Sequence, residues 1–469
     1  MKTENSTRFG FAQTVITPDA QAVYLDGFGE RITPAEGVRD PLYVKAFVIC
    51  AGSFRYALAV FDACGFEKRI ALGLKRSIAR WNGLTPDCVT VCATHTHSAP
   101  ASGVLGDLPI NYYLWDQIGM CAALTVQEAF QTASPCSPVF LRGDELSLMG
   151  NRRGRELCDR RIKICGFYDT ENSLKGALVL ASCHATCSSG MLLSADYPSV
   201  LTQAAQEKYP GVPFLFLQGR GADADPLLPD ELGDDERIAA LGGELADKVL
   251  SALENFENDG CVSACAPQLA SVTVKIPMLP YPPKAVLQKT IDFFEEKRGS
   301  AEDSFESRRI VREIYWHQKA LCETLEWEET PRENSLLAEL QLLRLSDRAA
   351  FLFLPFEIFC ETGNRLEAIC GIHGLETDSV FIVGHANGTN GYLAPASEFK
   401  MDDALLSDME YWYGKTICAK EAGTKEILSG HYEIINAPHW YNLPQCSRKS
   451  EMAVIRGVEM LFEKLSMQK

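Results

Sequence analysis

The feature that most constrains the fold is an alternation of apolar, β-rich runs with segments whose apolar residues recur at helical spacing. Residues 44–50 and 56–61 lie on either side of Gly52-Ser53, and this pattern predicts a β-hairpin. Residues 68–81 carry apolar residues at helical spacing and are followed by Asn82-Gly83, which predicts a helix and its end. Further strands are expected at 89–91, 139–142, 161–167, 176–183, 214–217, 336–345 and 349–354, and further helices at 113–132, 199–209, 234–256 and 451–465. The alternation predicts an α/β or α+β core.

One segment departs from this alternation. From residue 277 to about 329 the chain is interrupted by Pro282-Pro283 and is then rich in Glu, Lys and Arg at helical periodicity through Trp316. Charges at that periodicity are typical of a solvated helix face. We therefore expect a helical insertion at 277–329 inside a single domain that spans 1–469, with no internal repeat.

The acidic charge balance limits the expected partners. The 469 residues include 62 acidic and 45 basic side chains, a formal charge of −17, so nucleic acid is not an expected partner. No apolar run marks a signal peptide or approaches the roughly 20 residues of a membrane span, so stable membrane insertion is not expected. The 17 cysteines form no CxxC pair and are expected to be reduced thiols in a cytoplasmic protein. The sequence does not determine the oligomeric state.

Two histidines, His95 and His97, directly follow the predicted strand at 89–91. Side chains alternate with a period of two along a strand, so both imidazoles are expected on the same face. Such a pair can offer one imidazole to a metal ion and the other to a substrate. A pair of hydrogen-bonded surface histidines is the alternative.

Further polar side chains also follow apolar strands, where open sheets present functional groups. His184 follows the strand at 176–183, and Asp223 and Asp225 lie in the glycine-containing loop after 214–217. A lone histidine in such a place is often structural. The two carboxylates can bind a metal, orient a histidine or act as a general base.

Two segments in the last third of the chain have the same character. Glu357 follows a very apolar strand, and a buried carboxylate needs a partner, either a metal or an arginine such as Arg365. Tyr392 ends a glycine- and asparagine-rich loop that begins after Val383. Its phenol can ligate zinc or donate to a developing oxyanion, or the ring can simply pack.

Taken in order, these segments resemble the neutral/alkaline (non-lysosomal) ceramidase family. The matching pieces are 27–30 with 38–43, Thr94 to Ser98, Asn151-Arg152, His184 to Thr186, Gln218 to Pro226, Pro355 to Glu357, and Asn387 to Tyr392. Each piece alone is weak, but the ordered set spans nearly the whole chain. The resemblance implies a mixed-sheet catalytic domain that works as a zinc amidase, with a link to sphingolipid metabolism in the family.

The resemblance also implies roles for single residues. One Zn²⁺ would be held by His95, His184, Glu357 and Tyr392, a set of nitrogen and oxygen donors that suits zinc. His97 would contact the polar head of the substrate, and Arg152 would steady a carboxylate or a carbonyl oxygen. Gly27 and Gly29, with Asp223 and Asn387, are the further positions expected to contact substrate.

One departure from the family affects the mechanism. Asp225 stands where ceramidases carry a serine in a Gly-Asp-x-Ser-Pro pattern. A carboxylate is a poor nucleophile for an amide, since its acyl product would be an anhydride, but it is a good general base for a metal-activated water. We therefore predict direct attack of water on a linear amide, with Asp225 as base and Tyr392 or His97 stabilising the oxyanion. The alternatives are that Asp225 binds the metal or that activity is lost.

A second departure concerns the end of the chain. The part after Tyr392 is shorter than the roughly 100 residues of the immunoglobulin-like domain that ceramidases carry there, so no such domain is expected. A soluble N-acyl or ester substrate is accordingly expected in place of ceramide. An esterase or lactonase using the same site, and a catalytically inactive metal- or ligand-binding homologue, are the alternative functions.

Overall fold

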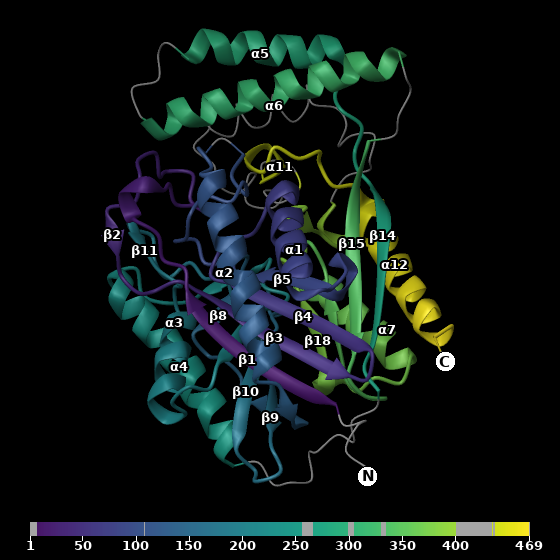
Figure 1. The fold of residues 1–469 in the computed structure, drawn as a ribbon. Coiled ribbons are helices and arrows are strands. Elements are labelled where there is room, and N and C mark those ends of the chain that lie inside the picture. Colours follow the sequence, from purple (N-terminus) through teal and green to yellow (C-terminus); the bar gives the residue numbers. More distant parts are fainter. Residues whose placement is uncertain are drawn as a thin grey trace.

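The computed structural model describes residues 7–106, 108–255, 266–298, 304–329, 334–399, 434 and 437–468. Its main feature is a repetition, since three sheets with the same order of strands surround one apolar core (Figure 1). In each sheet the first three strands pair antiparallel, and the fourth lies parallel to the third because a helix connects them. The sequence shows no internal repeat, so this repetition is a property of the chain topology. A segment can form a strand or a helix from its apolar periodicity alone, so three segments can share one order of elements without similar sequences.

The first sheet has the order β5-β4-β3-β1-β6. Its strands are β1 (Arg8–Val15), β3 (Tyr43–Ala51), β4 (Phe54–Phe61), β5 (Val89–Ala93) and β6 (Ser134–Pro135). Helix α1 (Lys68–Asn82) joins β4 to β5, and α2 (Tyr112–Gln131) packs against α1. The side chain of Asn111 caps α2 by accepting a hydrogen bond from the backbone N–H of Leu114 at 3.1 Å.

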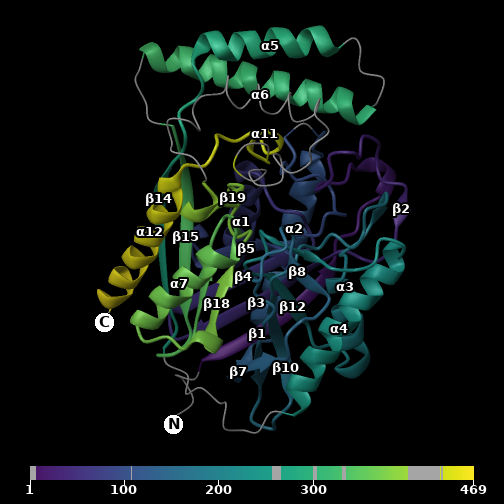
Figure 2. The same cartoon turned by 180° about the vertical axis from the view of Figure 1, so that it is seen from behind.

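The second and third sheets repeat this plan. The second has the order β12-β10-β9-β7, and the third has the order β14-β15-β16-β18. The second consists of β7 (Ser137–Gly143), β9 (Ile162–Tyr168), β10 (Leu174–Ala181) and β12 (Phe214–Gln218), with helices α3 (Pro198–Lys208) and α4 (Asp234–Glu254). The third consists of β14 (Gln268–Pro277), β15 (Ser335–Arg344), β16 (Ala350–Phe353) and β18 (Val380–Val383), with helices α7 (Cys360–Ile372) and α12 (Arg448–Ser466). Figure 2 shows α7 and α12 on one side of the molecule and α3 and α4 on the other.

The inner faces of the three sheets meet in one aromatic-rich core, whereas the helix pairs cover the outer faces. The ring of Phe9 from the first sheet lies 4.8 Å from that of Phe167 in the second, and the rings of Phe351 and Phe381 in the third lie 4.5 Å apart. Burial of each such side chain contributes roughly 1.5–3 kcal/mol. This shared core fixes the three sheets relative to one another, and with them the loops at the ends of their strands.

The segment 277–329, where the sequence predicts a helical insertion, contains α5 (Lys284–Arg298) and α6 (Ser304–Glu329). Both views show this helix pair crossing one end of the molecule, above the short helix α11 (Ala437–Trp440) (Figures 1 and 2). The indole N–H of Trp316 donates to the carbonyl oxygen of Leu443 at 2.9 Å, and Lys319 donates to that of Asn442 at 2.7 Å. Helix α6 therefore rests on the segment that follows α11.

The third and fourth strands of each sheet are parallel, so they end at the same edge. Short two-stranded sheets extend this edge. They pair β2 (Gly37–Val38) with β11 (Leu192–Leu193), β8 (Met149–Asn151) with β13 (Ala224–Pro226), and β17 (Glu357–Ile358) with β19 (Tyr392–Leu393). Single bridges join Thr96 to Ala185 and Cys92 to Ala386. Loops from all three sheets are thereby brought together.

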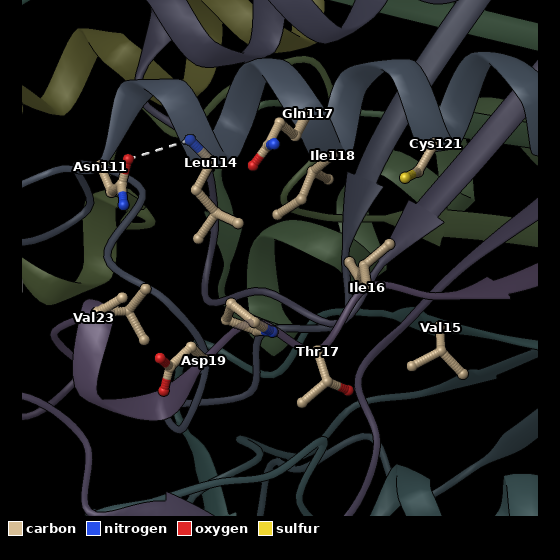
Figure 3. Close-up of a pocket in the computed structure, with 12 residues that line it drawn as sticks. Val15, Ile16, Thr17, Asp19, Val23, Asn111, Leu114, Gln117, Ile118 and Cys121 are labelled. Carbon is tan, nitrogen blue, oxygen red and sulfur yellow. Dashed lines mark hydrogen bonds between the residues drawn. The ribbon is translucent and has the colours of Figure 1, made fainter.

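A separate surface pocket of about 450 Å³ lies between the end of β1 and helix α2 (Figure 3). Its lining comes from residues 15–23 and 111–121 and includes none of the predicted site residues. Among the helices in the described ranges, none has the length and apolarity that crossing a membrane requires. The cysteines in those ranges are free thiols.

Candidate metal centre

Two histidines and one glutamate meet where the three sheets come together. His95 follows β5 of the first sheet, His184 follows β10 of the second, and Glu357 follows β16 of the third. Nε2 of His184 lies 3.3 Å from Oε2 of Glu357, and Nε2 of His95 lies 3.4 Å from the same oxygen. One donor atom from each residue lies within 4.8 Å of the others. Each of the three residues is at most 2% exposed, so the cluster is withdrawn from solvent.

The backbone sets the direction of the first ligand. His95 has a φ of 66°, in the left-handed region that non-glycine residues rarely adopt. Its N–H donates to the carbonyl oxygen of Ala63 at 2.9 Å, which ties the turn after β5 to the turn after β4. A conformation of this kind costs about 1–3 kcal/mol, and such costs cluster at functional sites.

The outer nitrogens of both imidazoles are held by backbone carbonyls. Nδ1 of His95 lies 2.6 Å from the carbonyl oxygen of Cys64, and Nδ1 of His184 lies 3.1 Å from that of Ala224. A carbonyl only accepts, so the proton of each neutral imidazole sits on Nδ1 and leaves a lone pair on Nε2. With both imidazoles neutral, two lone pairs then face one carboxylate, an arrangement that either a metal cation or a proton on one imidazole stabilises.

The spacing of the donors fits a divalent cation. Ligands of a tetrahedral zinc at about 2.0–2.2 Å lie about 3.4 Å from one another, close to the 3.3 Å and 3.4 Å observed between the imidazole nitrogens and Glu357. Nitrogen and carboxylate oxygen donors are also the chemical types that zinc accepts. The residues at this place therefore fit the ion that the resemblance implies.

The same contacts perturb protonation. Burial alone would raise the pKa of Glu357, but the hydrogen bonds from His184 and His95 and the nearby imidazoles hold that pKa well below its usual range. Burial opposes protonation of His184, yet the hydrogen bond to Glu357 and the charge of Asp225 raise its pKa. Without a metal ion, a proton on His184 is thus the local counter-charge of the carboxylate.

Two tyrosines adjoin the carboxylate of Glu357. The hydroxyl of Tyr441 donates to Oε1 of Glu357, the oxygen that does not face the imidazoles. Tyr392 is paired with Glu357 in the parallel bridge of β17 and β19, is 6% exposed, and has its ring 6.0 Å from that of Tyr441. The guanidinium carbon of Arg152 lies 5.5 Å from the centre of the Tyr392 ring. The structure thus places Tyr392 next to Glu357 in the sheet and Arg152 next to Tyr392.

His97 lies next to His95, with the two Nε2 atoms 3.3 Å apart. Arg31 donates to its carbonyl oxygen, and the ring of Phe28 stands edge-on 5.1 Å away. Gly27 has a φ of 99°, and a Cβ there would lie 2.4 Å from Cγ of His97, so this position has no room for a side chain. Burial, and then the neighbouring imidazoles, hold the pKa of His97 well below its usual range.

Asp225 lies beside His184 but on its outer side. Oδ1 of Asp225 is 3.4 Å from Nδ1 of His184, the nitrogen turned away from Glu357. The Asp225 side chain is 36% exposed, so water reaches it, whereas His184 is buried. The Asp225 carboxylate is therefore adjacent to a candidate ligand and open to solvent.

The side chains of two other predicted residues are used within the fold. Oδ2 of Asp223 accepts from Asn151 at 2.9 Å, and Oδ1 accepts from the N–H of Cys360 at 3.0 Å. The amide of Asn387 donates to Gln341 at 2.6 Å, and its oxygen accepts from the N–H of Val91 at 3.2 Å. These contacts tie the loop of Asp223 to β8 and α7 and the loop of Asn387 to β15 and β5, and they do not direct either side chain at Glu357.

Gly29 and Arg365 also have clear placements. A Cβ on Gly29 would lie 2.4 Å from the ring of Trp440, the last residue of α11, so Gly29 lets α11 approach. Arg365, the alternative partner for Glu357, is paired instead with Glu361 and Glu451 at 2.5 Å each.

Three residues of this region were not predicted from the sequence. Besides Tyr441, they are Cys64, whose carbonyl holds His95, and His385, whose ring stacks on His95 at 3.9 Å and 25°. His385 follows β18 and could have been found by the rule that identified His184. Tyr441 carries no local signal, because it reaches Glu357 only through tertiary packing.

The fold and this cluster define a mixed-sheet α/β protein with a buried candidate centre for one divalent cation. Its architecture is that of neutral ceramidase. The crystal structure of neutral ceramidase from Pseudomonas aeruginosa matches with a TM-score of 0.70 and 16% identity, covering 99% of this chain and 75% of that one. A structure of ceramidase complexed with C2 matches with the same score and identity, covering 99% and 76%.

At this identity the likeness establishes the fold, and it confirms the neutral-ceramidase-type fold expected from the sequence. No protein-family model matches the chain, and no curated protein sequence matches it.

Proposed function

We propose that this protein is a metal-dependent hydrolase that cleaves a linear amide bond of a small N-acyl substrate, with zinc as its metal. The observation that carries the proposal is the convergence of His95, His184 and Glu357, one from each sheet, on a buried point with metal-ligand spacing. The neighbours in fold are ceramidases, and the ordered motifs of the sequence resemble the same family. Tyr392, paired with Glu357 between β17 and β19, is the proposed fourth ligand.

A zinc ion at this place would supply Lewis acidity, which polarises a carbonyl group and makes water easier to deprotonate. The chain's own residues supply the rest. His97 stays neutral near pH 7, because burial holds its pKa well below the usual range, so it can donate one hydrogen bond to the substrate without bringing a charge. Arg31 holds its backbone carbonyl, and the lack of a side chain at Gly27 leaves room for its ring. Arg152 supplies a positive charge near Tyr392 for the carbonyl oxygen.

Asp225 is the proposed general base. It is ionisable, reachable by water and adjacent to His184, and it stands at the position of the family's serine. Because Nδ1 of His184 is nearer to the carbonyl of Ala224, at 3.1 Å, than to Asp225, at 3.4 Å, the carboxylate is not needed to set the imidazole tautomer. Since it lies on the outer side of His184 and water reaches it, it would accept the proton of the attacking water through an intervening water molecule.

The test is release of amine from a panel of N-acyl compounds by the zinc-loaded protein, with esters and lactones as a second arm. Hydrolysis of an amide that is abolished by chelation, restored by zinc and lost in His95→Ala supports the proposal. Turnover of esters or lactones alone would make the protein an esterase on the same site. Zinc binding without turnover in either arm would reject hydrolysis in favour of a binding protein.

A further inference from the structure

We infer that Cys64, His95 and His97 form a second coordination site, one that contains sulfur and takes a soft divalent cation such as Cd²⁺. It shares His95 with the candidate zinc centre. The inference goes beyond the proposed hydrolase, because it depends only on the placement of these three side chains.

The three donors are close enough to bind one ion. Cys64 follows β4 and is 1% exposed, and its Sγ lies 3.8 Å from Nδ1 of His95. The Nε2 atoms of His95 and His97 lie 3.3 Å apart, and one donor atom of each residue lies within 4.8 Å of the others. For tetrahedral zinc, with bonds of about 2.3 Å to sulfur and 2.0–2.1 Å to nitrogen, neighbouring donors lie about 3.4–3.6 Å apart. The longer bonds of a larger soft ion suit three donors that are spread over up to 4.8 Å.

The sulfur site and the zinc centre compete for one nitrogen. Nδ1 of His95 lies 3.8 Å from Sγ but is engaged by the carbonyl oxygen of Cys64 at 2.6 Å, so a cation held by the sulfur has to bind the ring through Nε2, or displace that hydrogen bond and move the ring proton to Nε2. That atom lies 3.3 Å from His97 on one side and 3.4 Å from Glu357 on the other. One lone pair serves one cation, so occupation of the sulfur site removes His95 from the zinc centre.

His97 is the imidazole best able to adapt to this second role. Its Nδ1 is buried and has no hydrogen-bond partner among the described residues. Nδ1 of both His95 and His184, by contrast, is held by a backbone carbonyl. The ring of His97 is thus not fixed by a hydrogen bond at its outer nitrogen.

The chemistry of the donors determines which ions are selected. A thiolate prefers soft cations, whereas the imidazole and carboxylate donors of the zinc centre suit a borderline ion. Binding replaces the thiol proton: Cys64-SH and M²⁺ give a Cys64–S–M bond, and the proton leaves to solvent. A soft cation should therefore inhibit the proposed hydrolase through Cys64, by withdrawing His95 from the centre that the reaction uses.

The experiment is a titration of the metal-free protein with one equivalent of Cd²⁺, following the ultraviolet thiolate-to-cadmium charge-transfer band. We expect the band in the wild type and in Glu357→Gln, which lacks a ligand of the zinc centre only. We expect it to disappear in Cys64→Ser. The matched control is Cys187→Ser, since Cys187 is equally buried, at 1% exposed, but takes no part in the Cys64–His95–His97 group.

Anomalous scattering from wild-type crystals soaked in Cd²⁺ gives a second readout that does not depend on how Cys64→Ser folds: a cadmium peak should lie at bonding distance from Sγ of Cys64. A band that persists unchanged in Cys64→Ser, or a cadmium peak that lies away from Sγ of Cys64, overturns the inference. No substrate enters either measurement, so failure of the proposed amide hydrolysis would leave both readouts unaffected.

Discussion

Replacement of Asp225 separates its proposed role as a base from a role in holding the metal. Asp225→Asn keeps the size of the side chain but removes its charge, and Asp225→Ala removes both. Loss of a general base lowers turnover by about 10²- to 10⁴-fold, so we expect kcat to fall by this factor in both variants. In terms of the barrier this is about 2.7–5.5 kcal/mol.

The same variants should change metal affinity only slightly. Unit charges placed on Asp225 and His184, 3.4 Å apart, would interact by about 5 kcal/mol at an effective dielectric constant of 20 and by about 1 kcal/mol in water. Because the Asp225 side chain is 36% exposed, the lower part of this range applies. The carbonyl of Ala224 still holds Nδ1 of His184 at 3.1 Å. We therefore expect zinc affinity to fall by no more than about tenfold, below the upper end of the 10- to 100-fold effects of outer-shell partners.

The assay pairs single-turnover kinetics at saturating zinc with competition against a chromogenic chelator. The exposed Asp116 on α2 gives a matched control, since Asp116→Asn removes one acidic charge from a helix that contributes no residue to the cluster. If zinc affinity falls by more than 100-fold while excess zinc restores turnover, the carboxylate serves the metal and the reasoning about the base is refuted.

Two further predictions concern the residues around the carboxylate of Glu357. Tyr441→Phe removes the hydrogen bond to Oε1 of Glu357 and should weaken zinc binding by about 10- to 100-fold. The control, Tyr315→Phe at an exposed tyrosine of α6, should leave zinc affinity unchanged. Equal zinc affinities of the two variants in chelator competition would contradict this prediction. In the metal-free protein the pKa of His184 is raised above its ordinary value of 6.5, so its contribution to stability is complete below pH 6.5 and is lost as pH rises through the folded-state pKa. The pKa of Glu357 is depressed below its ordinary value of 4.5, so its contribution is lost only in acid, as pH falls below 4.5. Urea unfolding in chelator should therefore show stability falling above pH 6.5, with zinc removing the decline; a metal-free protein that gains stability over that range would refute the assignment.

Local patterns predicted much of the fold. The hairpin of β3 and β4, helices α1, α2 and α4, and strands β15 and β16 all lie where periodicity places them, because each carries its own apolar repeat. Strands β1 and β14 were not predicted. The threefold order of elements was also missed, since it is a property of chain topology and is absent from the residue pattern.

The candidate site was predictable to the extent that its residues directly follow strands. His95, His184 and Glu357 meet that condition, and the sheets bring them together. Asp223 and Asn387 also follow apolar strands, yet their side chains hold neighbouring loops, a use that sequence cannot distinguish from substrate contact. Contacts that arise only when separate elements pack were not predictable.

The most direct test of the account is the position of zinc in crystals of the zinc-loaded protein, located by anomalous scattering at the zinc edge. The account predicts one strong peak at bonding distance, about 2.0–2.2 Å, from Nε2 of His95, Nε2 of His184 and Oε2 of Glu357. A peak elsewhere, or loaded crystals in which these three donors keep their contacts with no metal between them, would contradict the claim that they form a metal centre.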